Sequence, residues 1–258
     1  MNGNGKIFVC GDLHGGFEDT LKLSRKKWLE QDNLTKDDVV IQLGDFGYIW
    51  YHDLHQKYKK DQNTLKDLSN KKFTLCFVDG NHENFELLYS YPEVDMFGSK
   101  VREVYPGIYW LQRGHIYTIN GKTFFVMGGA KSNANQKEGN FSGKGRNKKL
   151  KKQKTWWAEE LPSQEELELG RNNLIQLNWN VDYVVSHTCP TEIIKSIYHQ
   201  TVICNLDRLN DPISLYFDEI EDNLIFKEWH FGHHHCDLEI KTDFGNFLCH
   251  YKNTPYEL

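Results

Sequence analysis

Five short polar blocks recur along the chain, and each follows a run of β-branched or aromatic residues. Together they supply two aspartates, one side-chain amide and several imidazoles. The blocks are Gly11-Asp12-Leu13-His14-Gly15, Gly44-Asp45, Gly80-Asn81-His82-Glu83, Ser186-His187 and Gly232-His233-His234-His235. Asp and His side chains suit divalent metals of borderline softness such as Mn, Fe, Co, Ni or Zn. The set is large enough to hold two such ions.

The residue types within these blocks favour phosphoryl chemistry. Asp12 and His14 are two positions apart, so they lie on one face of an extended segment and both can reach one ion. Asp45 has two carboxylate oxygens with which it could bridge two ions. Asn81 offers a neutral oxygen, which leaves the ions electrophilic. Two ions about 3.5–4 Å apart clamp the attacking and leaving oxygens of an in-line displacement and lower the pKa of a shared water.

Strands and helices must place these blocks together, and the first third of the chain indicates how. Apolar runs over residues 6–10, 39–43 and 73–78 predict strands that end at the first three blocks. Between them, we expect a helix over about Phe17–Glu30 and a second helical segment carrying Leu54, Tyr58, Leu65 and Leu68. A β-α-β-α-β order implies parallel strands with helical crossovers.

The sequence of the remaining two thirds of the chain predicts shorter strands with tight turns, including a hairpin around Asn120-Gly121. A strand over 181–185 leads to the Ser-His block, and a strand over 229–232 leads to the final histidine block. Asp211-Pro212 is typical of a helix start, and Ser163 to Glu166 is a capping box. We expect mixed sheets sandwiched between helices.

Composition narrows the class of protein. At 258 residues and 14% aromatic content, the chain can bury a sizeable core. Its net charge of −5 gives no global reason to expect nucleic-acid binding. The six cysteines form no C-x-x-C pair, and no apolar stretch approaches the roughly 20 residues of a membrane span. We expect a reduced, cytoplasmic protein without a membrane partner.

One segment, at about 131–162, is long, polar and aperiodic, which predicts a functional or mobile loop. Between Lys144 and Lys154 it carries seven basic residues and no acid, and Trp156-Trp157 follow. A solvated loop is one interpretation. The alternative is a lid that selects a polyanionic substrate. The two tryptophans could stack on a base of that substrate, or they could pack in the core.

The five blocks, in this order, resemble the calcineurin-like metallophosphoesterase superfamily, whose pattern is Asp-x-His, Gly-Asp, Gly-Asn-His-Asp/Glu, a lone His and Gly-His-x-His. The resemblance runs from Lys6 to about His250. It implies a four-layer α/β/β/α sandwich of mixed sheets, expected to form a single domain over residues 1–258. It also implies hydrolysis of a phosphate ester through a hydroxide that bridges two divalent ions. Manganese is the first expectation, with Fe, Zn, Ni, Co and Mg as alternatives.

The same resemblance assigns the site residues. One metal would be held by Asp12, His14, Asp45 and His235. The other would be held by Asp45, Asn81, His187 and His233. His82 would be the unligated general acid that protonates the leaving alkoxide.

Two positions depart from the branch that contains Ser/Thr protein phosphatases and diadenosine tetraphosphatases. That branch continues its second block as Gly-Asp-x-x-Asp-Arg-Gly, but this chain has Tyr48 and Ile49 in place of the Asp and the Arg. We therefore expect another acid, Asp79 or Glu83, to orient His82. A different arginine would grip the phosphate, since guanidinium binds it bidentately. The candidates are Arg102, Arg113 and Arg146.

The sequence does not distinguish among phosphate monoesters, phosphate diesters and pyrophosphates as the substrate. A phosphorylated substrate is expected, with nucleotides and nucleic acids among the candidates, and the sequence indicates no obligate protein partner. A nuclease or a cyclic-nucleotide phosphodiesterase would use the same site. A further alternative is a non-catalytic, metal-bound module that binds nucleic acid or protein through the basic loop.

Overall fold

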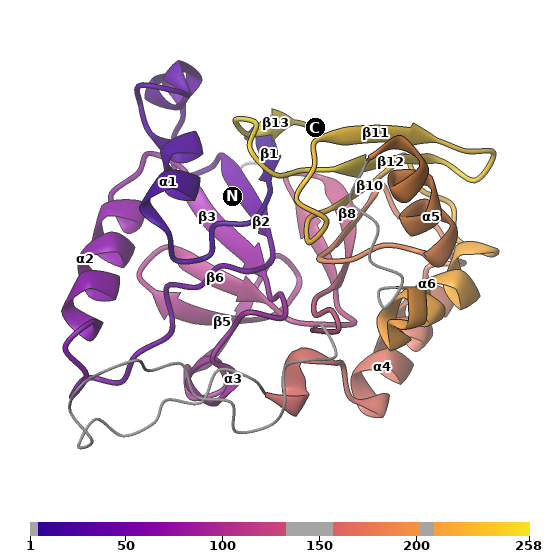
Figure 1. Ribbon diagram of the computed structural model, residues 1–258, viewed down its shortest axis with the longest axis horizontal. Helices are drawn as coiled ribbons and strands as arrows, with labels where there is room; N and C mark the ends of the chain where they lie inside the picture. Colours follow the sequence, from indigo (N-terminus) through magenta and orange to yellow (C-terminus); the bar gives the residue numbers. More distant parts are fainter. Residues whose placement is uncertain (1–4, 133–156, 202–208) are drawn as a thin grey trace.

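Two mixed sheets lie face to face in the computed structural model, which describes residues 5–132, 157–201 and 209–258 (Figure 1). In these residues, the first sheet has the order β13-β1-β2-β3-β6-β5-β4, and the second has the order β11-β12-β10-β9-β8-β7. The strands of the first sheet are β1 Ile7–Cys10, β2 Val39–Leu43, β3 Thr74–Val78, β4 Glu93–Met96, β5 Ser99–Tyr105, β6 Ile108–Leu111 and β13 Tyr256–Glu257. Those of the second are β7 Ile116–Ile119, β8 Lys122–Met127, β9 Tyr183–Ser186, β10 Glu228–Phe231, β11 Leu238–Lys241 and β12 Asn246–Cys249.

The central strands of both sheets run parallel, as the alternating strand and helix pattern predicts. β1, β2 and β3 pair in parallel register, with Phe8 opposite Val40 and Val40 opposite Leu75. β8, β9 and β10 do the same in the second sheet. These strands are buried on both faces, which explains their unbroken apolar sequences. Their carboxyl ends bring the polar blocks to one edge of the molecule.

Helices cover the outer face of each sheet. On the first sheet these are α1 Phe17–Thr20, α2 Tyr58–Ser69 and α3 Phe85–Leu88, and on the second α4 Gln164–Gln176, α5 Thr191–Gln200 and α6 Pro212–Glu221 (Figure 1). The predicted helix starts are confirmed, because Ser163 and Glu166 form a capping box and Asp211 caps α6.

Three apolar cores separate the four layers. One joins α2 to the first sheet through Leu65 and Leu68, and another joins the second sheet to α4, α5 and α6. The third lies between the sheets, where Val9 and Ile41 share a cluster with Val126. The expected α/β/β/α sandwich is confirmed.

The predicted helix over Phe17–Glu30 is wrong. Only α1 is α-helical, and two 3₁₀ turns follow, η1 Leu21–Leu23 and η2 Leu29–Asn33. Ser24 adopts extended backbone angles, and the buried Lys22 ammonium donates hydrogen bonds to the carbonyls of Asp12 and Tyr251. Trp28 is buried as the helical pattern indicates, whereas Leu21, expected on the same face, is only partly buried.

The segment expected to form a long basic loop is described only near its ends. Ser132 begins it, and η3 Ala158–Glu160 lies near its end, where Glu160 accepts hydrogen bonds from Ser132. The predicted lid and the basic run at 144–154 lie outside the described residues. Trp157 packs in the first core against Trp50, in agreement with the core-packing interpretation. No helix in the described ranges has the length and apolarity to cross a membrane.

Candidate metal centre

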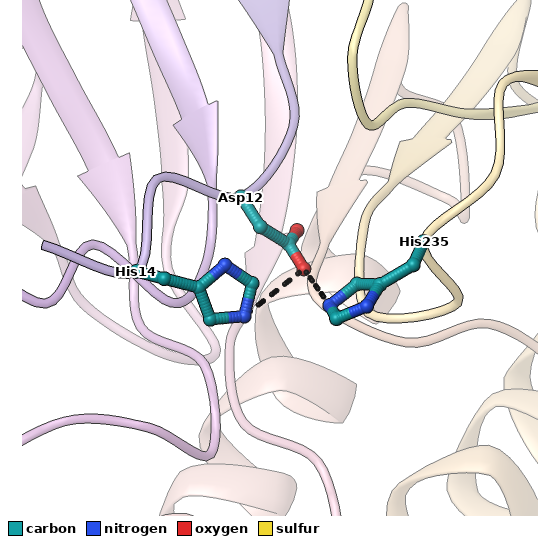
Figure 2. Close-up of side chains that lie close together, drawn as sticks. All are labelled: Asp12, His14 and His235. Carbon is teal, nitrogen blue, oxygen red and sulfur yellow. Dashed lines mark ion pairs between the residues drawn. The ribbon is translucent and has the colours of Figure 1, made fainter. Parts of the chain in front are cut away.

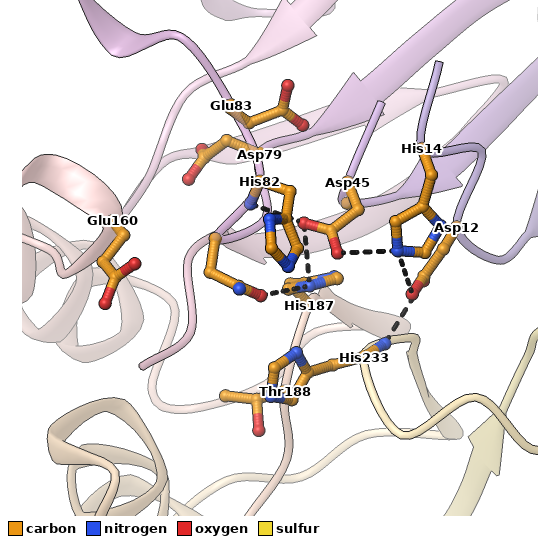
Figure 3. Close-up of polar contacts among 12 residues, drawn as sticks. Asp12, His14, Asp45, Asp79, His82, Glu83, Glu160, His187, Thr188 and His233 are labelled. Atoms are coloured by element: carbon orange, nitrogen blue, oxygen red, sulfur yellow. Dashed lines mark hydrogen bonds and ion pairs between the residues drawn. The ribbon is translucent and has the colours of Figure 1, made fainter. Parts of the chain in front are cut away.

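All five polar blocks meet where the strands of both sheets end. Asp12, Asp45 and Asn81 follow β1, β2 and β3 of the first sheet, whereas His187 and His233 follow β9 and β10 of the second (Figure 3). The site therefore lies across the boundary between the sheets, as expected for parallel strands whose carboxyl ends share an edge.

Asp12, His14 and His235 form one group of candidate ligands (Figure 2). Asp12 Oδ2 lies 3.2 Å from His235 Nε2 and 4.0 Å from His14 Nε2. This oxygen is buried and accepts no hydrogen bond from the described residues. A buried carboxylate oxygen that faces two imidazole nitrogens and accepts no hydrogen bond suits a shared cation, because burial without a partner is costly.

Asp45 connects this group to a second one, which consists of Asp12, Asp45 and His187. Asp45 Oδ2 lies 3.2 Å from His14 Nε2, and Asp45 Oδ1 lies 3.4 Å from His187 Nε2. The two oxygens of one carboxylate thus face different imidazoles (Figure 3). This is the arrangement that a bridging ligand requires.

The remaining predicted ligands border the second group. Asn81 Oδ1 lies 3.3 Å from His187 Nε2, and the His233 ring lies 4.9 Å from the His187 ring, centroid to centroid. His187 Nδ1 lies 2.7 Å from the Leu43 carbonyl oxygen, which directs Nε2 into the centre. The structure brings all seven predicted ligands together.

The backbone at the site is strained. His14, Asp45, His233 and His235 all have positive φ, between 49° and 63°. Non-glycine residues rarely adopt this conformation, and each instance costs about 1–3 kcal/mol, so it persists where the surroundings impose it. At Gly44 a side chain would collide with the His187 ring, so glycine permits the close approach of the two sheets.

Neighbouring charges set the protonation of the central pair. Burial alone would raise the pKa of Asp45, but the charge of His187 and the hydrogen bond from His14 hold it well below its usual range. Burial acts to lower the pKa of His187, yet the Asp45 carboxylate raises it to about 9. The centre thus keeps an ionised carboxylate in a buried position and favours positive charge beside it.

The donor set fits divalent metals. Carboxylate, amide and imidazole groups suit the first-row transition ions, and within each group the ligand atoms lie within 4.8 Å of one another. The two groups share Asp12, and Asp45 of the second group also contacts His14 of the first.

His82 lies beside the centre but belongs to neither group of candidate ligands. Its backbone N–H donates to Asp45 Oδ1 at 2.8 Å, and its ring lies 6.0 Å from the His14 ring. The side chain is half-buried and lines a cavity of about 390 Å³. A proton donor at this position would face a substrate bound at the centre.

The two acids expected to orient His82 have other partners. Asp79 accepts hydrogen bonds from Trp110 Nε1 and from the Arg113 guanidinium. Glu83 accepts from the backbone N–H groups of Phe46 and Gly47, and burial raises its pKa to about 8. In the described part of the chain, neither carboxylate hydrogen-bonds the His82 ring. Both acids instead stabilise the loops that carry the ligands.

The two departures from the branch pattern belong to the core. Tyr48 is buried and its hydroxyl donates to the Gly16 carbonyl, which fixes the start of α1. Ile49 is also buried. Neither side chain takes over the function of the Asp or the Arg that it replaces.

Of the predicted phosphate-binding arginines, the two that lie in the described ranges are paired with carboxylates. Arg113 is buried and pairs with Asp79 at 2.5 Å and with Glu166 at 3.3 Å, so its guanidinium has no face left for a phosphate. Arg102 pairs with Glu93 and donates to the carbonyls of Tyr89 and Tyr91. Arg146 lies outside the described residues.

Ser132 and Glu160 support the site, although no pattern in the sequence indicated them. Asn81 Nδ2 donates to Ser132 Oγ at 3.1 Å, and Ser132 Oγ donates to Glu160 Oε2 at 2.6 Å. This chain of hydrogen bonds turns Asn81 Oδ1 toward His187. Both residues lie in the aperiodic segment at 131–162, where spacing carries no structural signal.

Comparison with known proteins identifies the family. The family model described as calcineurin-like phosphoesterase matches residues 5–237. Since that range covers most of the sequence, the chain belongs to the calcineurin-like phosphoesterase family. It is therefore a metal-dependent hydrolase that acts on phosphoric ester bonds.

No curated protein matches the sequence significantly. Among solved structures, a phosphopantetheinyl hydrolase from Mycobacterium tuberculosis is similar, with a TM-score of 0.48 and 15% sequence identity. The alignment covers 100% of this chain and 97% of that one. At this identity the two proteins need not share a substrate.

Proposed function

We propose that the protein hydrolyses a phosphate ester at a centre of two divalent ions, with His82 as the general acid. The observation that carries the proposal is the position of Asp45, whose two carboxylate oxygens face His14 on one side and His187 on the other. A carboxylate in this position can serve two ions at once. Manganese is the first candidate for both, because the donors are oxygen and imidazole nitrogen.

The ligands divide into two sets that share Asp45. One ion would be held by Asp12, His14, Asp45 and His235, and the other by Asp45, Asn81, His187 and His233. When bound, the two ions would supply Lewis acidity toward the phosphoryl oxygens and a water of lowered pKa.

The protein's own residues place the proton donor. The His82 backbone N–H is bonded to the same Asp45 carboxylate that joins the two groups, so the His82 ring is held close to the bound phosphate. The water oxygen forms the new P–O bond, the P–O bond to the leaving group breaks, and His82 donates its proton to the leaving oxygen. This donation matters most when the leaving group is a poor one, such as an alkoxide.

Replacement of His82 by alanine tests the assignment. With manganese-loaded protein, we expect His82→Ala to lower kcat for an alkyl phosphate by about 10²–10³, and for p-nitrophenyl phosphate by much less, because nitrophenolate needs no proton. Metal content should be unchanged. His199→Ala, which alters an exposed histidine at the end of α5, is the control.

Two outcomes would contradict the proposal. Equal losses on both substrates at unchanged metal content would remove His82 from the role of acid. If wild-type protein released no phosphate from either substrate with any divalent ion, hydrolysis at this centre would be excluded for these esters and the proposal would be wrong.

A further inference from the structure

A cavity of about 390 Å³ joins the metal centre to the beginning of α2. His14 and His82 line it from the centre. Trp50 and Lys57 line it from the segment that leads into the helix, and Lys60 lines it from the first turn. A substrate that is bound at the centre and extends past His82 would therefore meet the first turn of α2.

The lining has an excess of positive charge. Lys57 and Lys60 are three residues apart, so their side chains project from the same face of the helix. Across the described ranges, neither forms an ion pair, and both are exposed. Among the described residues, Asp61 is the one carboxylate of the lining, and it is buried with the backbone N–H groups of Trp50 and Tyr51 directed at it. Two ammonium groups against one buried carboxylate make the cavity attractive to an anion.

Aromatic contacts help to hold one of the lysines in place. Lys57 Nζ lies 5.4 Å from the centroid of the Tyr51 ring, within the range of a cation–π interaction. The Tyr51 ring in turn stacks on His55 at 4.2 Å. These contacts restrict the Lys57 side chain, so less conformational entropy is lost when an anion binds.

We propose that Lys57 and Lys60 bind a second phosphate group, one carried by the leaving group of the substrate. The inference rests on the proposed function, in which His82 faces the leaving oxygen, so that the cavity beyond His82 receives the leaving group. Lysine binds phosphate as a compact point charge. The substrate class is then a phosphate ester whose leaving group bears a further phosphate, and the two lysines provide the anion recognition that neither Ile49 nor the buried Arg113 can supply.

Competition with a chromogenic substrate tests this subsite. The probes are adenosine 3′,5′-bisphosphate and adenosine 5′-monophosphate, used as inhibitors of p-nitrophenyl phosphate hydrolysis. We expect wild-type protein to bind the bisphosphate about ten-fold more tightly, as two partly exposed ion pairs allow. The double variant Lys57→Gln/Lys60→Gln should lose this preference.

Lys59→Gln is the matched control. Lys59 lies between the two lysines in sequence and is equally exposed, but it does not line the cavity. The Lys59→Gln substitution removes one positive charge from the same turn and should leave the ten-fold preference for the bisphosphate intact. If wild-type protein binds both nucleotides equally, or if the double variant keeps the preference, the subsite is excluded.

The same experiment separates this inference from the proposed function. If neither p-nitrophenyl phosphate nor the alkyl phosphate is hydrolysed, the proposed function fails, and calorimetric binding of the two nucleotides to wild-type and double-variant protein then decides the subsite alone. If hydrolysis is normal but the lysine variants do not change the relative affinities, only the subsite fails.

Discussion

The Asp45 carboxylate lies 3.4 Å from the His187 imidazole, although Asp45 follows β2 of the first sheet and His187 follows β9 of the second. The contact joins two parts of the chain that are far apart in sequence. A divalent ion bound between these residues would connect the two sheets directly. Metal binding should therefore affect the stability of the fold as well as its chemistry.

The first prediction concerns this stabilisation. At a free metal concentration of about 100 times Kd, binding adds about 2.7 kcal/mol to the free energy of unfolding, or roughly 5–10 °C in Tm for a chain of this size. Thermal unfolding with manganese and with chelator should show this difference. Asp45→Asn should abolish it, whereas Asp95→Asn, at an exposed carboxylate paired with Lys100, should retain it. An equal shift in Asp45→Asn protein would contradict the account.

The second prediction concerns the support of Asn81. Ser132→Ala removes the acceptor of the Asn81 amide and leaves Glu160 with one partner fewer. Because such supporting hydrogen bonds orient ligands, we expect the metal concentration for half-maximal activity to rise about ten-fold or more, with a smaller change in kcat at saturating metal. Ser90→Ala, at an exposed serine, should have no effect. An unchanged metal requirement would show that Asn81 does not depend on Ser132.

That the candidate ligands would lie together could be predicted from the sequence because their signal is local. Each ligand block follows a short apolar run, and parallel strands necessarily bring their carboxyl ends together. The residues that orient the ligands could not be predicted in this way. Ser132 and Glu160 meet Asn81 only through tertiary contacts, and nothing in their spacing marks them.

The errors have a similar physical origin. Periodicity correctly placed Trp28 in the core, but it could not show that Lys22 would be buried against carbonyls from distant segments. That contact accompanies 3₁₀ turns where a helix was expected. Arg113 was a reasonable phosphate ligand by residue type, and only the structure shows Asp79 beside it.

The third prediction follows from that buried ion pair. Removal of one partner leaves an uncompensated buried charge, so Arg113→Met should lower the free energy of unfolding by about 3–5 kcal/mol. Lys100→Met, which breaks the exposed pair with Asp95, should cost less than about 1 kcal/mol. Urea denaturation measures both. If Arg113→Met changed only substrate affinity and left stability unaltered, Arg113 would be a substrate ligand after all.

The fourth prediction concerns pH. Burial raises the pKa of Glu221 to about 7, and the nearby carboxylates of Asp218, Asp222 and Glu192 add to the shift. An acid whose pKa is raised on folding stabilises the protein below its unfolded pKa, and this contribution is lost as the pH rises toward 7. Glu221→Gln should therefore be more stable than wild type at about pH 8, by about 1 kcal/mol after allowance for solvent screening.

The comparison at low pH provides the check. At about pH 4 both side chains are neutral, so wild type and Glu221→Gln should have nearly equal free energies of unfolding. A constant difference between Glu221→Gln and wild type at all pH values would mean that the charge of Glu221 is not the cause.

The number of metal ions bound per chain tests the central claim most directly. Equilibrium dialysis against manganese, followed by elemental analysis, should find two ions in the wild-type protein, with phosphate release from p-nitrophenyl phosphate rising as the second ion binds. Asn81→Ala should keep one tightly bound ion, and Asp45→Asn should weaken both, because Asp45 serves both ligand sets. A single ion in fully active wild-type protein, or two tightly bound ions in Asp45→Asn protein, would contradict the dinuclear centre.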